Sequence, residues 1–196
     1  MRVLALTGGI ASGKSSAMEI FRREVPGMVG FDADVCVRDL LANDEGIIEK
    51  VVGVFGESCR ADEGAGIHRS ELRKRVFGNP ELRQLLESWI HPRVREECLE
   101  VLKSAGKLAA PLFLAEIPLL FEGGFHFGQE LNLTVAVTKE TQRNRLMARN
   151  GFSRSLCESI LEAQLPMEIK IRRTEVVLWN EGPQVMLEKQ IQRFLK

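Results

Sequence analysis

The sequence predicts an α/β fold in which helices cover a parallel sheet. Short apolar runs alternate with segments of helical periodicity along the 196 residues. The runs are apolar throughout, rather than at every second position, which is typical of parallel strands buried on both faces. The first run leads through a glycine-rich turn straight into a helix, as in a strand–helix unit of such a fold. With 44% hydrophobic residues, the chain has enough apolar surface for one sizeable core.

The individual elements follow from these patterns in order along the chain. Continuous apolar runs predict strands at residues 3–7, 28–31, 112–117, 131–137 and 176–179. Apolar spacings of three and four, with their flanking signals, predict helices at residues 15–24, 79–104, 141–150, 153–164 and 184–195. The mostly helical stretch between the second and third strands is too long for a simple crossover, so we expect an inserted helical subdomain there.

The longest predicted helix has a clear start and one internal interruption. Asn79 is a good N-cap and Pro80 suits the first helical position, where its missing N–H is no loss. Pro92 lies inside the apolar stripe of the same helix. A proline there removes a backbone hydrogen bond, so we expect Pro92 to kink the helix or to divide it in two.

Composition excludes several classes of protein. Lys and Arg total 27 and Asp and Glu total 27, so the formal net charge is zero, which disfavours a strongly basic nucleic-acid binder. The four cysteines and three histidines are scattered, without the short ligand pairs of a structural zinc site. The sequence shows no signal peptide and no apolar run long enough to span a membrane. We therefore expect a soluble cytoplasmic protein with reduced thiols and no membrane partner.

The strongest local signal is a phosphate-binding loop directly after the first predicted strand. Its eight residues satisfy G-x-x-x-x-G-K-[ST]: Gly8, Gly9, Ile10, Ala11, Ser12, Gly13, Lys14 and Ser15. Glycines let the backbone turn its N–H groups toward phosphate oxygens, and the helix that follows adds the positive end of its dipole. Lys14 would reach the β- and γ-phosphates, and Ser15 would offer its hydroxyl to Mg²⁺. With Ser16 beside them, these residues predict an ATP site.

Other motifs narrow the class of nucleotide-binding protein. The N-K-x-D motif of GTPases and the L-S-G-G-Q-like signature of transporter ATPases are absent from the sequence. Glu116 ends the third predicted strand, where a lone acid either holds Mg²⁺ through water or serves as a capping carboxylate. These features favour a small-molecule kinase.

A basic segment late in the chain fits the same chemistry. Arg145 and Arg149 are four residues apart and so share one face of the predicted helix. Such a face can close over ATP and neutralise the charge that develops on the transferred phosphoryl group. The alternative interpretation is a solvated basic helix face.

Two carboxylates follow the second predicted strand. Asp32 and Asp34 lie where a parallel sheet presents its ligand crevice. One of them can accept the proton of an attacking hydroxyl, and the other can cap the helix that follows. Because Asp32 is nearest the strand end, we assign it the catalytic role.

These residues together resemble the dephospho-CoA kinase family over essentially the whole chain. The resemblance rests on the order and spacing of several strings: Leu6-Thr7-Gly8-Gly9-Ile10, Asp32-Ala33-Asp34, His91-Pro92, Pro118-Leu119-Leu120-Phe121-Glu122, and Arg149-Asn150-Gly151, with Gln142, Arg145, Gln164 and Asn180. The resemblance implies a P-loop nucleoside triphosphate hydrolase-type core at about residues 1–31, 111–140 and 174–196. It also implies an acceptor-binding helical insertion at about 32–110 and a small helical lid at about 141–173.

The resemblance also implies an activity and roles for matching residues. ATP, with Mg²⁺, would phosphorylate the 3′-hydroxyl of dephospho-CoA to give CoA and ADP, the final step of coenzyme A biosynthesis. Asp32 would be the base, and Asn180 would lie near the adenine. Asp34, His91, Leu119, Phe121 and Glu122 would line the acceptor side. The partner would be this small molecule and no nucleic acid, with the protein a monomer or small homo-oligomer.

The sequence differs from the family pattern at two places, and two other functions remain as alternatives. Family members commonly carry arginine where this chain has Ile160, which puts one lid contact in doubt, and Thr174-Glu175 replaces a common Ala-Asp. A related kinase for a nucleoside monophosphate or an alcohol is the first alternative. A catalytically idle ATP-binding regulatory homologue is the second, and intact Lys14, Ser15 and Asp32 argue against it.

Overall fold

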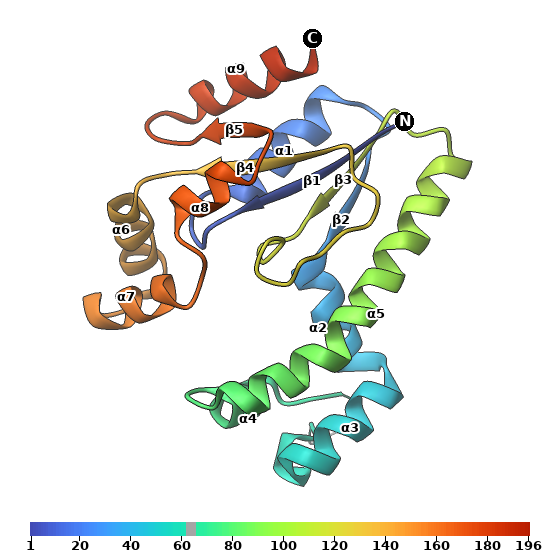
Figure 1. Ribbon diagram of the computed structural model, residues 1–196, viewed down its shortest axis with the longest axis vertical. Coiled ribbons are helices and arrows are strands. Elements are labelled where there is room, and N and C mark those ends of the chain that lie inside the picture. Colours follow the sequence, from blue (N-terminus) through green and yellow to red (C-terminus); the bar gives the residue numbers. More distant parts are fainter. Residues whose placement is uncertain (62–65) are drawn as a thin grey trace. The chain divides into compact units, whose positions relative to one another are not determined.

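The computed structural model describes residues 1–61 and 66–196, so that positions 62–65 of the predicted insertion lie outside the described residues. The chain divides into two compact units (Figure 1). Met1–Asp32 and Leu99–Lys196 form the first unit, and Ala33–Cys98 form the second. The first unit contains the sheet, and the second is helical.

A parallel sheet organises the first unit, as the continuous apolar runs predict. In the described part of the chain its strands are β1 (Arg2–Gly8), β2 (Val29–Asp32), β3 (Leu112–Glu116), β4 (Leu131–Ala136) and β5 (Val176–Trp179). Their order is β2-β3-β1-β4-β5, and each neighbouring pair is parallel. The α/β fold class predicted from the sequence is therefore confirmed, and β1 lies at the centre of the sheet.

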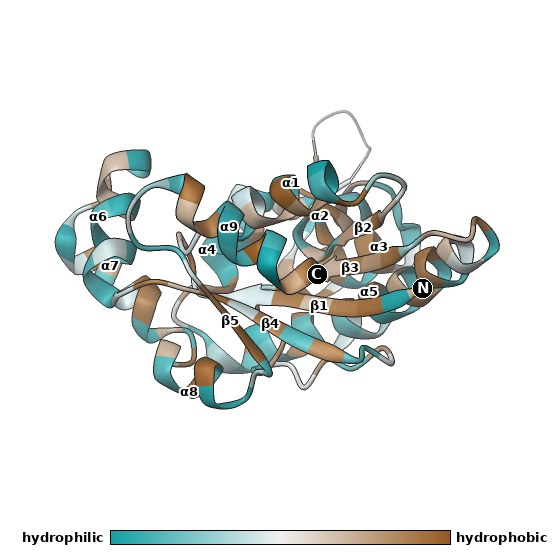
Figure 2. Cartoon of the chain, turned by 90° about the horizontal axis from the view of Figure 1, so that it is seen from above, coloured by the Kyte–Doolittle hydropathy of each residue, from teal (hydrophilic) through white to brown (hydrophobic). Residues whose placement is uncertain are grey.

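Two helices of the first unit, α1 (Lys14–Glu24) and α9 (Gln184–Leu195), bury apolar side chains against this sheet. The unit also contains α6 (Lys139–Asn150), α7 (Arg154–Glu162), α8 (Met167–Arg172) and residues 99–107 of a long helix that begins in the second unit. Phe21, Leu187 and Ile191 are buried in one cluster with the strand residues Leu4 and Leu114. Figure 2 shows hydrophobic residues in brown along β1, β4 and β5, whereas α6 is largely teal. The polar helix α6 is thus free to carry functional side chains.

The caps of α6 and α7 explain why the two short helices start and stop where they do. Thr138 Oγ1 accepts from Thr141 N at 3.2 Å at the start of α6, and Ser153 Oγ accepts from Leu156 N at 3.3 Å at the start of α7. Gly151 ends α6 in the left-handed region, with φ of 66°. The predicted break at this glycine is confirmed.

A side chain covers part of the unpaired backbone edge of strand β5, the last strand of the sheet. Gln190 of α9 accepts from Trp179 N at 2.9 Å through Oε1 and donates to Trp179 O at 2.8 Å through Nε2. One side-chain amide therefore satisfies both backbone groups of the last residue of β5, in the manner of a neighbouring strand.

The second unit is built from α2 (Ala33–Asn43), α3 (Glu45–Phe55), a 3₁₀ turn (Glu57–Cys59), α4 (Arg69–Val76) and the first part of α5 (Pro80–Lys107). Asn79 caps α5 as predicted, since its Oδ1 accepts from Leu82 N at 3.1 Å. The predicted alternative of two helices divided at Pro92 is wrong, because α5 is one helix. Pro92 removes a single helical bond, and buried Ile90, Val94 and Cys98 on one helix face favour continuity.

Two kinds of feature are absent from the described residues. Within residues 1–61 and 66–196, no helix is both long and apolar enough to cross a membrane. In the same two segments, His, Cys, Asp and Glu side chains form no group of three or more that could bind a metal ion. The four cysteines Cys36, Cys59, Cys98 and Cys157 are free.

Candidate active site

The carboxyl edge of the sheet gathers the first set of predicted site residues. Asp32 at the end of β2 pairs in register with Glu116 at the end of β3. Glu116 also pairs with Leu6 of β1, two residues before the phosphate-binding loop begins at Gly8. Parallel strands place their ligand crevice at this edge. The predicted base, the predicted metal-side acid and the loop therefore belong to one edge of the first unit.

The shape of the loop depends on its glycines. Gly13 has φ of 97°, and a Cβ atom there would overlap the side-chain amide of Asn180. Gly8 has φ of 150°, and a Cβ atom there would lie 2.5 Å from Val135 O. Both positions therefore require glycine for conformation and for space.

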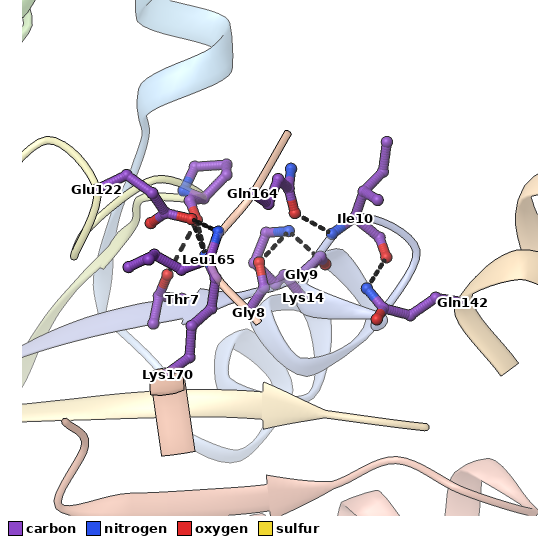
Figure 3. Close-up of polar contacts among 11 residues, drawn as sticks. Thr7, Gly8, Gly9, Ile10, Lys14, Glu122, Gln142, Gln164, Leu165 and Lys170 are labelled. Carbon is purple, nitrogen blue, oxygen red and sulfur yellow. Dashed lines mark hydrogen bonds and ion pairs between the residues drawn. The ribbon is translucent and has the colours of Figure 1, made fainter. Parts of the chain in front are cut away.

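Lys14 lies at the junction between the loop and α1. Its Nζ donates to Gly8 O at 3.2 Å and to Gly9 O at 3.3 Å (Figure 3). The ammonium is thus folded back over the loop, where a phosphate oxygen would compete with these carbonyls for its protons. Ser15 follows in the first turn of α1 and is exposed.

Two glutamines from outside the loop bind the backbone N–H and C=O of the same loop residue, Ile10. Gln142 Nε2 of α6 donates to Ile10 O at 2.7 Å. Gln164 Oε1 accepts from Ile10 N at 3.0 Å, from the segment that follows α7. Figure 3 shows both contacts beside Gly9 and Lys14. The loop conformation is therefore tied to elements far away in the sequence.

Arg145 and Asn180 hold the other half of the loop. Arg145 Nη1 donates to Ala11 O and to Ser12 O, each at 3.2 Å, and its Nη2 donates to Asn180 O at 2.9 Å. Asn180 Nδ2 donates to Ser12 O at 2.8 Å. Arg145 therefore contacts the loop backbone, a role that spacing alone did not predict. Arg149 is exposed and has no ion pair among the described residues.

A carboxylate beside this cluster is held in its charged form. Glu181 accepts from Thr138 N at 2.6 Å and from Thr141 Oγ1 at 2.8 Å. The hydrogen bond from the Thr138 backbone is the largest cause that lowers the pKa of Glu181, and Arg145 adds a smaller electrostatic contribution. Glu181 thus links the start of α6 to the segment after β5.

The predicted acceptor residues after β3 are partly engaged within the protein. Leu119 and Phe121 are half-buried. Glu122 Oε1 lies 2.7 Å from Lys170 Nζ and accepts from Leu165 N at 3.0 Å. Lys170, which sequence reasoning missed, is fully buried. A lysine in the short segment MEIKIR gave no signal, because its partner is distant in the sequence.

The remaining predicted acceptor residues, Asp34 and His91, belong to the second unit. Asp34 is exposed in the first turn of α2, and His91 is half-buried within α5. In the first unit, a cavity of about 260 Å³ adjoins the loop at Gly9 and is also lined by Gln142 and Gln164. The glutamines that support the loop therefore also border open space beside it.

The oxygen donors near the loop suit a hydrated Mg²⁺. Ser15 is exposed at the start of α1, and Glu116 is buried at the neighbouring strand end. Mg²⁺ in phosphoryl-transfer sites keeps several waters and takes one or two protein oxygens together with phosphate oxygens. The donor set fits that requirement without a dedicated protein cage.

Comparisons with known proteins agree on one family. The family model described as dephospho-CoA kinase matches residues 2–185. The chain is 37% identical to a dephospho-CoA kinase of Carboxydothermus hydrogenoformans over 99% of its own length and 93% of that protein. It is 35% identical to one of Bacillus anthracis, covering 99% of this chain and 96% of the relative.

Solved structures extend this similarity to the fold. A structure of TT1252 from Thermus thermophilus has a TM-score of 0.80 and 32% identity over 99% of this chain and 96% of its own. A shikimate kinase from Bacteroides thetaiotaomicron has a TM-score of 0.52 and 15% identity, covering 98% of this chain and 95% of that one. The second similarity concerns the fold alone.

Proposed function

The chain belongs to the dephospho-CoA kinase family, and on that premise we propose that it transfers the γ-phosphoryl group of ATP to the 3′-hydroxyl of dephospho-CoA. The products are CoA and ADP. One observation carries the proposal: the phosphate-binding loop and Asp32 lie at the same carboxyl edge of the sheet. A phosphate site and a proton acceptor at one edge are what a kinase needs for a hydroxyl acceptor.

On the ATP side, the loop residues Gly8 to Ser16 bind the phosphates. Lys14 exchanges its bonds to Gly8 O and Gly9 O for bonds to β- and γ-phosphate oxygens. Because Arg145 and Asn180 already hold the loop backbone, little reorganisation is needed when the nucleotide arrives. Asn180 also borders the adenine.

A bound Mg²⁺ would neutralise charge on the β- and γ-phosphates. Ser15 would contribute a direct oxygen ligand, and Glu116 would act through water. Both residues lie at the edge of the sheet that carries the loop.

On the acceptor side, Asp32 orients the attacking hydroxyl and takes its proton. The hydroxyl oxygen forms the new P–O bond as the bond between the γ-phosphorus and the bridging oxygen of ADP breaks. The proton passes to the Asp32 carboxylate. Asp34, His91, Leu119, Phe121 and Glu122 are proposed to bind the rest of the acceptor.

We propose a separate function for each part of the chain. Residues 1–31, 111–140 and 174–196 form the nucleotide-binding core, residues 32–110 bind the acceptor, and residues 141–173 act as the lid. Arg145 and Arg149 are the proposed lid cations. We also propose that the protein acts in the cytoplasm, as a monomer or small homo-oligomer without a nucleic-acid partner.

The test is a substrate comparison on purified protein. ATP and Mg²⁺ are supplied with dephospho-CoA, AMP or shikimate, and ADP release is measured together with the mass of the phosphorylated product. We expect turnover with dephospho-CoA alone. Preferred phosphorylation of AMP or shikimate would overturn the proposed acceptor, and ATP binding without turnover on any acceptor would favour a regulatory role.

A further inference from the structure

Lys170 is a fully buried charged side chain in a short helix. Its relative exposure is 0%. Removing an ammonium group from water is costly unless other groups replace the lost hydration. Here Nζ lies 2.7 Å from Glu122 Oε1 and donates to Pro118 O at 3.1 Å. Lys170 of α8 is therefore bound to both ends of the segment Pro118-Leu119-Leu120-Phe121-Glu122.

Both acceptors of Lys170 are shared with other parts of the first unit. Pro118 O also accepts from Thr7 Oγ1 at 3.2 Å, one residue before the phosphate-binding loop. Glu122 Oε1 also accepts from Leu165 N at 3.0 Å. Figure 3 shows Lys170, Glu122 and Thr7 in one connected group. The buried ammonium thus joins β1, the segment after β3 and the connection into α8.

The contacts of this group form a chain of hydrogen bonds that reaches the phosphate-binding loop at both of its ends. Gln164, directly before Leu165, accepts from Ile10 N at 3.0 Å, so one end of this chain of hydrogen bonds is held at the third residue of the loop. Thr7, directly before Gly8, holds the other end through Pro118 O. Lys170 is the group that joins the two halves. Ile117 N donates to Leu6 O at 2.9 Å and already holds the start of the segment 118–122 beside β1, so Lys170 fixes the far end of the segment, at Glu122, relative to Pro118 and the loop.

Stability alone is a poor reason for this arrangement. Replacing a buried ion pair by apolar groups of similar volume is often neutral or stabilising. The pair is also incompletely satisfied, since Glu122 Oε2 is buried with no hydrogen-bond partner in the described part of the chain. A costly pair that joins two functional segments points to a role in their geometry.

We propose that Lys170 is a positioning residue, which sets the segment 118–122 against the phosphate-binding loop so that the acceptor hydroxyl meets the γ-phosphate in line. The inference rests on the proposed function, because the segment matters only if it binds the acceptor. Lys170 itself contacts neither ATP nor the reacting atoms. Its loss should therefore affect turnover of dephospho-CoA much more than binding of ATP.

The experiment separates positioning from stability with two variants. Lys170→Met keeps most of the side-chain volume but leaves Glu122 buried without its cation, so its melting temperature should fall. Lys170→Met/Glu122→Gln removes both charges, so its melting temperature should return toward the wild-type value. We expect both variants to lose at least about tenfold in kcat at saturating dephospho-CoA, where a weaker binding contact from Glu122 would appear in KM instead, and to keep the Kd for ATP within about twofold. Lys189→Met, an exposed lysine of α9, is the matched control and should behave like wild type.

Each other outcome overturns the inference. Recovery of kcat together with the melting temperature in the double variant would make the pair purely structural. Wild-type kcat in Lys170→Met would remove any role, and failure of both variants to fold would make the pair a requirement of the fold. An inactive wild-type protein would overturn the proposed function first, which distinguishes that failure from an active wild type with unaffected variants.

Discussion

Lys14 is the residue on which we propose that binding of the phosphates depends most directly. Its ammonium already lies on the loop, 3.2 Å from Gly8 O. Lys14→Ala removes the fixed charge that would face the β- and γ-phosphates. The activation free energy should therefore rise by roughly 3 kcal/mol, which lowers kcat about a hundredfold. Steady-state kinetics and circular dichroism check this, and the fold should be intact. A variant that keeps more than about a tenth of wild-type kcat would contradict the phosphate assignment.

Asp32 is the second residue whose role can be isolated. Asp32→Asn keeps the size and a hydrogen bond but removes the proton acceptor at the end of β2. We expect kcat to fall about 10²–10⁴-fold, the usual range for general-base catalysis, while the Kd for ATP changes little. Kinetics and nucleotide titration measure the two quantities. A variant with normal kcat and a lower melting temperature would make Asp32 a helix cap.

Arg145 and Arg149 are expected to differ, because the structure places their side chains differently. Arg145 bonds to Ala11 O, Ser12 O and Asn180 O, so Arg145→Ala should loosen the loop as well as remove a charge. We expect a loss of at least about tenfold in kcat/KM for ATP, roughly 1.4 kcal/mol, and a lower melting temperature.

Arg149→Ala should lose at least about tenfold in kcat/KM for ATP with an unchanged melting temperature, since Arg149 is exposed and we propose that it acts only when the lid closes. The same assay on Arg154→Ala and Arg172→Ala completes the comparison. If only those two substitutions reduce activity, the assignment of the lid cations is wrong.

At the scale of elements, one carboxylate of α7 bridges to two cations of α6. Glu158 of α7 lies 2.7 Å from Lys139 Nζ and 2.6 Å from Arg143 Nη1, both of α6. The hydrogen bond from Lys139 and then that from Arg143 lower the pKa of Glu158 from 4.5 to about 2. Because the folded pKa is depressed, this contribution is present above the ordinary pKa and is lost as pH falls from about 4.5 to about 2.

The corresponding prediction concerns local opening rather than global stability. Hydrogen exchange in α7 should accelerate as pH falls through this window, beyond the intrinsic pH dependence of exchange. Glu158→Gln should show the faster, low-pH behaviour already at neutral pH. The exchange of β1 serves as the internal reference. Equal protection of α7 in wild type and variant would show that the ion pairs do not hold the two helices together.

Some of the strands and helices could be predicted from the sequence and others could not. The strands were predictable to within one or two residues, because a buried parallel strand is a local apolar run. The six-residue helix α8 was missed, since it is too short for periodicity and its buried Lys170 has a partner in another segment. The alternative of two helices divided at Pro92 was wrong, because a local rule did not account for the buried face of α5.

At the scale of the whole molecule, the identity of the site was easier to predict than its support. The loop Gly8 to Ser15 is one contiguous string whose chemistry can be derived from its residue types. Its support comes from Gln142, Arg145, Gln164 and Asn180, which meet the loop only in the folded chain. Sequence spacing gave Arg145 a charge-neutralising role, and its bonds to three carbonyls emerged only from three-dimensional contacts.

The amide of Gln190 on Trp179 has a consequence for how copies of the protein behave in a crowded solution. An uncovered strand edge is a template on which another chain can build, the route by which sheets aggregate. Gln190 occupies both backbone groups of Trp179, and β5 carries two exposed apolar side chains, Val177 and Trp179. Gln190→Ala should therefore raise concentration-dependent self-association, measured by light scattering, with Gln192→Ala as the control. Unchanged scattering would show that Gln190 does not protect the edge of β5 from pairing with another chain. Increased scattering would make this one glutamine a determinant of colloidal stability.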